Sequence, residues 1–149
     1  MNGSRRGRCR GLDATETCIR LIAGQKPALI LVEDDPSVLR ALRRLMVSAG
    51  FEVRTFDRPK AVLDSAMPKS DACLIVDVHL PEMTGVELCE ALAASGCHLP
   101  VIMITGHADQ ATRELTRRAN PIAVLLNPFS RESLLAAISK ALAVAKDAS

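Results

Sequence analysis

The sequence predicts an α/β domain with a doubly wound, five-stranded parallel sheet and five helices. From Pro27 onward, short apolar runs alternate with segments whose apolar residues recur at helical spacing. This alternation is typical of a parallel sheet that helices cover on both faces. In addition, three of the apolar runs end in polar residues, and ligands of open α/β sheets bind at the carboxyl ends of the strands.

The first predicted strand and helix occupy residues 28–50. Residues 28–32 form an apolar run that is typical of a buried strand. Asp35 is a suitable helix N-cap with Pro36 at the first helical position, and Gly50 ends the helix. The residues that recur at helical spacing on its apolar face are Val38, Leu42, Leu45 and Ala49.

The next two strands flank a short helix. Residues 51–56 alternate between apolar and polar side chains, which predicts a second strand. We expect Asp57 to cap a short helix that begins near Pro59. The apolar run at 72–77 is the third predicted strand, and it ends in Asp77.

The remaining elements follow the same alternation. Thr84 and Glu87 form a capping box for a helix that ends at about Ser95. A fourth strand, a polar helix and a fifth strand are expected at 100–104, from Asp109 to about Arg118, and at 122–126. Ser130 caps the last helix, whose apolar face is Leu134, Ile138, Ala141 and Ala145.

The composition is that of one soluble globular domain. The 149 residues are 48% hydrophobic and 24% charged, which is enough to bury a core. Aromatic residues make up 2%, without Trp or Tyr, so nothing favours base stacking or an aromatic ligand cage. No apolar stretch approaches the roughly 18 residues that a membrane span needs, and we expect no membrane partner.

The cysteines indicate a reducing compartment. Their number is odd and they form neither a CxxC pair nor a metal-ligand cluster, which favours reduced thiols and a cytoplasmic location. We expect structural, redox-inert roles for all of them, since a free cysteine behaves as a small hydrophobe. The five are Cys9, Cys18, Cys73, Cys89 and Cys97.

The charge is unevenly distributed along the chain. Residues 1–26 contain six basic and two acidic side chains, against a net charge of +2 for the whole chain. We expect a disordered, solvated extension, or a start codon placed upstream of the true domain, followed by one domain at 27–149. A basic arm can also bind nucleic acid or an anionic surface, but the arm alone does not lead us to expect a nucleic-acid partner.

The polar strand ends predict one pocket. Glu33, Asp34 and Asp35 follow the first strand, Asp77 ends the third, and Thr105 follows the fourth. A carboxylate can act as a nucleophile toward phosphorus, and clustered carboxylates favour a hard cation such as Mg²⁺. Helix capping and solvation explain Asp35 equally well, but they do not explain Asp34 together with Asp77.

With these residues the sequence resembles the receiver domain of bacterial two-component response regulators, over about residues 28–145. The segments 81–88 and 104–107 look most like receivers of the nitrogen-fixation regulator type, which are usually fused to a LuxR-like helix-turn-helix that we do not find here. The resemblance implies a flavodoxin-like fold. Its landmarks stand in order: Glu33-Asp34-Asp35, Asp77 with Leu80-Pro81 and Gly85, Thr105-Gly106, and Asn127-Pro128-Phe129.

The resemblance also implies a role for each site residue. Asp77 would be the phosphoacceptor. Asp34 and Asp77 would bind Mg²⁺ directly, Glu33 would act through water, and His79 would contribute its backbone carbonyl. Thr105 would donate a hydrogen bond to the phosphoryl group and move toward it.

Two histidines lie near the expected pocket. His79 is two residues beyond Asp77, and His107 is two residues beyond Thr105. We expect both side chains to be solvated, because a lone histidine on a loop is more often solvated than a ligand. The sequence places no second nitrogen or sulfur ligand near either one, so a zinc site is not predicted.

Two positions depart from the family pattern. Asn127 stands where the family has a lysine, so the site lacks a fixed positive charge and keeps only a neutral hydrogen-bond donor. Val124 stands where the family usually has Tyr or Phe, whose ring moves inward with the threonine. By resemblance, the Asn127-Pro128 peptide bond is cis. We expect phosphate acceptance with weak or altered coupling to conformation.

We therefore predict a stand-alone receiver that takes phosphate from a histidine kinase or a phosphotransfer protein. It would signal to a downstream protein, or to a second copy of itself, through the fourth and fifth predicted helices. Arg113, Arg117 and Arg118 of the fourth helix are candidate contacts, although a solvated charged face explains them equally well.

Two other classes remain as alternatives. The first is a pseudo-receiver, a binding module whose phosphate switching is altered or lost, and Asn127 and Val124 favour it. The second is an enzyme such as an aspartyl-phosphate hydrolase, which would have its nucleophile after the first strand and a second acid two residues later. Asp77 follows the third strand and its second neighbour is His79, so we expect no enzyme beyond slow self-dephosphorylation.

Overall fold

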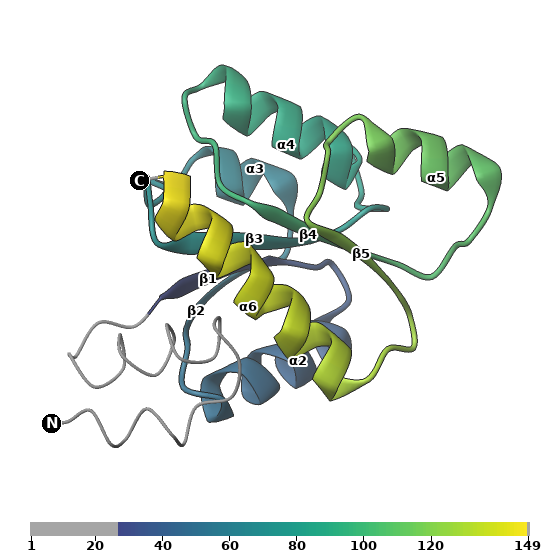
Figure 1. The fold of residues 1–149 in the computed structure, drawn as a ribbon. Helices are drawn as coiled ribbons and strands as arrows, with labels where there is room; N and C mark the ends of the chain where they lie inside the picture. The colour runs from purple at the N-terminus through teal and green to yellow at the C-terminus, as the bar shows by residue number, and fades with distance from the viewer. Residues whose placement is uncertain (1–26, 149) are drawn as a thin grey trace, which may run out of the picture.

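The computed structural model describes residues 27–148, with side chains up to residue 145. It contains one parallel sheet with the strand order β2-β1-β3-β4-β5 (Figure 1). The predicted doubly wound α/β fold is confirmed. The elements are β1 (Ala28–Val32), α2 (Pro36–Ser48), β2 (Glu52–Phe56), α3 (Pro59–Leu63), β3 (Ala72–Asp77), α4 (Gly85–Ala94), β4 (Val101–Thr105), α5 (Gln110–Arg117), β5 (Ala123–Leu126) and α6 (Arg131–Ala148). The expectations for the basic arm, Cys9 and Cys18 lie outside the described residues.

Helices cover both faces of the sheet. In Figure 1, α2 and α6 lie on one face, and α3, α4 and α5 lie on the other. Successive residues of a strand point to opposite faces. Leu29 and Leu31 of β1 therefore pack with Ile138 of α6, whereas Ile30 packs with Leu88 of α4. Because both faces are buried, β1 and β3 are almost continuously apolar.

The two edge strands are less buried than the central ones. β2 has one exposed residue and four partly buried residues. On β5, Val124 and Leu126 are 44% and 48% exposed. These two side chains and α5 line a groove of about 500 Å³ that extends from Thr105 to Asn120. The sheet is therefore firmly packed at its centre and open at the β5 edge.

The predicted helix caps are present, with one exception. Asp35, Asp109 and Ser130 each accept a backbone N–H of the helix that follows, and Thr84 with Glu87 forms the capping box. The prediction that Asp57 caps α3 is wrong, because the N-cap residue is Arg58, without a side-chain cap bond. Because α3 begins at Pro59, the N-cap position falls on Arg58, whose side chain has no acceptor oxygen, and not on Asp57.

The structure also bears on the predictions for the cysteines and for membrane spans. Cys73, Cys89 and Cys97 are free thiols, and burial raises the pKa of each. Among the described residues, no helix is both long enough and apolar enough to cross a membrane.

Candidate functional site

The candidate site lies where the strand order reverses. β1 and β3 are neighbours, and the helices that follow them, α2 and α4, pack on opposite faces of the sheet (Figure 1). Ligands of open α/β sheets bind at this point of the carboxyl edge. Glu33 and Asp34 follow the end of β1 at this edge, and Asp77 is the last residue of β3.

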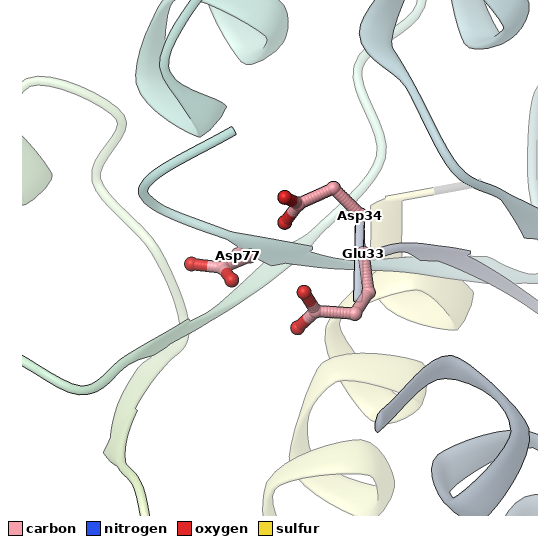
Figure 2. A group of neighbouring side chains, drawn as sticks. All are labelled: Glu33, Asp34 and Asp77. Atoms are coloured by element: carbon pink, nitrogen blue, oxygen red, sulfur yellow. The ribbon is translucent and has the colours of Figure 1, made fainter. Parts of the chain in front are cut away.

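The three acidic side chains converge as predicted. One carboxylate oxygen from each of Glu33, Asp34 and Asp77 lies within 4.8 Å of the others. Figure 2 shows the three carboxylates directed to the same side of the strand ends. The structure therefore assembles one oxygen-rich cluster from residues 44 positions apart in the chain (33 and 77).

Burial disfavours the ionised form of two carboxyl groups in this cluster and so raises their pKa values. Glu33 is only 4% exposed, and its burial, followed by the charge of Asp77, raises its pKa to about 8. The Asp35 N–H, 3.1 Å from the Glu33 carboxylate, partly opposes that rise. Burial also raises the pKa of Asp77, whereas the hydrogen bond from the His79 N–H, at 3.0 Å, lowers it.

The donor set fits a hard divalent cation. Carboxylate oxygens are the ligands that Mg²⁺ prefers, and the cost of bringing three acidic groups together is offset when a cation neutralises them. The site thus meets the chemical requirement for the Mg²⁺ that the sequence predicts.

A glycine permits the tight turn after Asp77. The Gly85 N–H donates to the Val78 carbonyl at 2.8 Å, and a Cβ atom on Gly85 would lie 2.4 Å from the Asp77 carbonyl oxygen. No side chain fits there without displacing the backbone of Asp77. The start of α4 therefore packs directly against the backbone of Asp77.

Thr105 lies beside Asp77 at the end of the neighbouring strand. Its preceding residue, Ile104, is the register partner of Asp77. The Thr105 side chain is buried, and its Oγ1 accepts the His107 N–H at 3.0 Å. The hydroxyl is thus held by its own loop in this structure.

Residues 29–139 match the model of the response regulator receiver domain. The chain belongs to this receiver family. The receiver domain is 36% identical over 116 residues to nodulation protein W of Bradyrhizobium diazoefficiens, and covers 51% of that protein with 78% of this chain. It is 31% identical over 112 residues to the transcriptional regulatory protein FixJ of Azorhizobium caulinodans, and covers 53% of that protein with 75% of this chain.

A solved structure agrees with this assignment. The crystal structure of FixJ-N superposes with a TM-score of 0.73 at 28% identity, covering 80% of this chain and 95% of that chain. The chain spans about half the length of the curated relatives described above.

The two positions at which the resemblance implies a departure from the family pattern, Val124 and Asn127, lie on β5 and directly after it. The Asn127 N–H donates to the Thr105 carbonyl at 2.8 Å, so Asn127 is directly beside the buried threonine. The Asn127-Pro128 bond is cis, as the resemblance implied. The side chain of Val124 is 44% exposed and lines the open groove next to α5.

The sequence did not predict that the two histidines meet. The imidazole rings of His79 and His107 are 4.6 Å apart between centroids, with an interplanar angle of 77°. The expectation that no second nitrogen lies near either histidine is therefore wrong. Each histidine lies two residues beyond the end of its strand, and β3 and β4 are adjacent in the sheet. These equal offsets from neighbouring strand ends are the feature of the sequence that could have predicted the contact.

Proposed function

We propose that this receiver accepts a phosphoryl group on Asp77 from a histidine kinase or a phosphotransfer protein, with Mg²⁺ bound beside it. One carboxylate oxygen of Asp77 attacks the phosphorus and forms an oxygen–phosphorus bond. The nitrogen–phosphorus bond of the donor's phosphohistidine breaks, and the released imidazole takes up a proton from water. The convergence of Asp77 with Glu33 and Asp34 within 4.8 Å carries this proposal.

The cation site is proposed to use the residues that the family pattern indicates. Asp34 and Asp77 would bind Mg²⁺ directly, Glu33 through water, and His79 through its backbone carbonyl. When bound, the ion supplies positive charge to the carboxylates and to the transferring phosphoryl group. The His79 N–H holds Oδ1 of Asp77, which leaves Oδ2 as the candidate nucleophile.

Thr105 and Asn127 would stabilise the phosphorylated form. The Thr105 hydroxyl would exchange its contact with the His107 N–H for a phosphoryl oxygen. The Asn127 amide would donate a neutral hydrogen bond, which is weaker than the charge-assisted bond of a lysine. We therefore expect phosphate acceptance together with weak transmission toward β5.

The output is proposed to pass through protein contacts near α5 and α6. Two of the three candidate arginines already have intramolecular roles. Arg118 forms an ion pair with Glu90 of α4 at 2.8 Å, and Arg113 donates to the Ala108 carbonyl. Arg113 and Arg117 are both exposed and both line the β5 groove. Arg117 takes part in neither of these two contacts, so it is the better candidate for a partner protein. A cytoplasmic location stays a prediction from the cysteines.

The test is Mg²⁺-dependent phosphorylation by acetyl phosphate, followed by intact mass. Wild type should gain the mass of one phosphoryl group, and Asp77→Asn should gain none. Asp35→Asn is the matched control, because Asp35 is an exposed carboxylate at the same edge and asparagine caps helices equally well. The control should be modified like wild type. An unmodified wild type would contradict the proposal.

A further inference from the structure

The contact between His79 and His107 brings two imidazole rings together near the carboxylate cluster. Their nitrogens are metal ligands of a different kind from the carboxylate oxygens. His79 lies in the loop after β3 and His107 in the loop after β4. Both side chains are exposed, so an ion and its water ligands can reach them. The edge-to-face arrangement, with centroids 4.6 Å apart, brings the two imidazoles as near to each other as ligands of one ion.

The separation suits a shared metal ion. With metal–nitrogen bonds of about 2.0 to 2.1 Å, two imidazoles on one ion have ring centres roughly 5 Å apart. The terminal torsion of histidine is broad, so a rotation of one exposed ring turns a nitrogen of each toward a common point. Little backbone adjustment is therefore required.

We propose that His79 and His107 form a binding site for a transition-metal ion that prefers imidazole, such as Ni²⁺, Cu²⁺ or Zn²⁺. Imidazole nitrogen suits these ions, whereas Mg²⁺ prefers oxygen. Two protein ligands leave the remaining positions to water. The carboxylate cluster and the histidine pair thus select different cations, and the histidine site does not depend on phosphorylation of Asp77.

The surroundings orient the pair and favour positive charge. The Thr112 hydroxyl is 3.5 Å from Nε2 of His79, which leaves Nδ1 available to a metal. A second hydrogen-bond partner of this kind holds a ligating ring in place. Asp109 lies close enough that His107 and His79 contribute to lowering its pKa, after the larger effect of the Thr112 N–H. Its carboxylate adds negative potential near the site.

An ion held by this pair would tie together the two loops that follow Asp77 and Thr105. The His79 N–H contacts the Asp77 carboxylate, and the His107 N–H contacts the Thr105 hydroxyl. Metal binding would therefore restrain both residues from outside the carboxylate cluster.

The experiment is a titration of the full chain with Ni²⁺ in excess Mg²⁺, which occupies the carboxylates. Calorimetry measures affinity, and paramagnetic broadening of amide signals locates the ion. We expect one saturable site, with the strongest broadening at residues 78–80 and 106–109. His79→Gln and His107→Gln should each weaken binding by at least about tenfold, by comparison with the loss from removing a supporting partner.

The control is His98→Gln. His98 is the third histidine of the chain, and it is exposed in the segment between α4 and β4, so its loss should leave Ni²⁺ affinity unchanged. The proposal is overturned if wild type shows no saturable site in excess Mg²⁺. It is also overturned if the two test variants bind as wild type does, or if broadening centres on Glu33 and Asp34 or on cysteines.

Discussion

The carboxyl edge of the sheet has two ends that differ in packing and in charge. At β1 and β3, strands buried on both faces present three carboxylates within 4.8 Å of one another. At β5, half of the strand is exposed, Val124 borders an open groove, and Asn127 is neutral. Under the proposed function, the β1 and β3 end would accept the phosphoryl group and the β5 end would transmit its presence. The difference in packing and charge between the two ends therefore leads us to expect acceptance with weak transmission.

The largest expected effect comes from crowding the acceptor end. In Gly85→Ala, the new Cβ would meet the Asp77 carbonyl at 2.4 Å. Such overpacking costs about 1 to 3 kcal/mol of unfolding free energy, and it should also slow phosphorylation. Urea unfolding measures the first effect. Gly106→Ala, at the end of β4, is the control, because a Cβ there meets nothing within 4 Å. If the two variants lost equal amounts of unfolding free energy, the close packing at Gly85 would not be the cause of the loss.

The second prediction concerns pH and Mg²⁺. In the folded chain the Glu33 pKa is about 8, above its ordinary 4.5. Between these pH values the folded state holds a proton that the unfolded state releases. In Mg²⁺-free buffer this group therefore lowers the unfolding free energy as pH rises toward about 8, and adds no further change above it.

The matching variant is Glu33→Gln. Thermal unfolding across this pH range should show a smaller decline for the variant than for wild type. Mg²⁺ should bind wild type more tightly as pH rises through the same range, because the ion competes with the proton. Identical pH profiles for the two proteins would show that Glu33 does not hold the proton.

The third prediction sharpens the contrast in charge. Asn127→Lys restores a cation beside Thr105, and charge-assisted hydrogen bonds are roughly twice as strong as neutral ones. The yield of phosphorylated protein at a fixed acetyl phosphate concentration should rise severalfold, by intact mass. Lys140, an exposed residue of α6, allows a control: Lys140→Asn changes a distant charge and should leave the yield unaltered.

The smallest expected effect is at the groove. Val124→Tyr places a ring where the family usually has one, at a position that is 44% exposed. Surface substitutions of this kind usually change stability by less than about 0.5 kcal/mol. If the groove next to α5 accepts the ring, amide signals of Thr112 and Thr116, which line it, should shift. Unchanged signals at both would show that the ring stays in solvent.

Features encoded by local patterns could be predicted from the sequence. The strand ends at Val32 and Asp77, and the capping box of Thr84 with Glu87, follow from periodicity and short-range hydrogen bonding, and the fourth strand was predicted to end one residue before Thr105. The carboxylate cluster followed from these ends, because parallel strands finish at one edge.

Features that depend on tertiary contacts could not be predicted. The approach of Gly85 to the Asp77 carbonyl and the meeting of His79 with His107 arise from how α4 and neighbouring loops pack. The predicted Asp57 cap is absent because α3 begins at Pro59, which places Arg58 at the N-cap position. The equal offsets of the two histidines from their strand ends become informative only once β3 and β4 are known to be neighbours.

We propose that Asp77 is phosphorylated and that the resulting change reaches β5 only weakly. The most direct measurement is the amide NMR spectrum of the protein in Mg²⁺ before and after acetyl phosphate, with occupancy checked by intact mass. We predict large shifts at residues 33–35 and 77–80 and small shifts at Val124 and Leu126. Shifts at β5 as large as those at β3, in protein shown to be phosphorylated, would contradict the account.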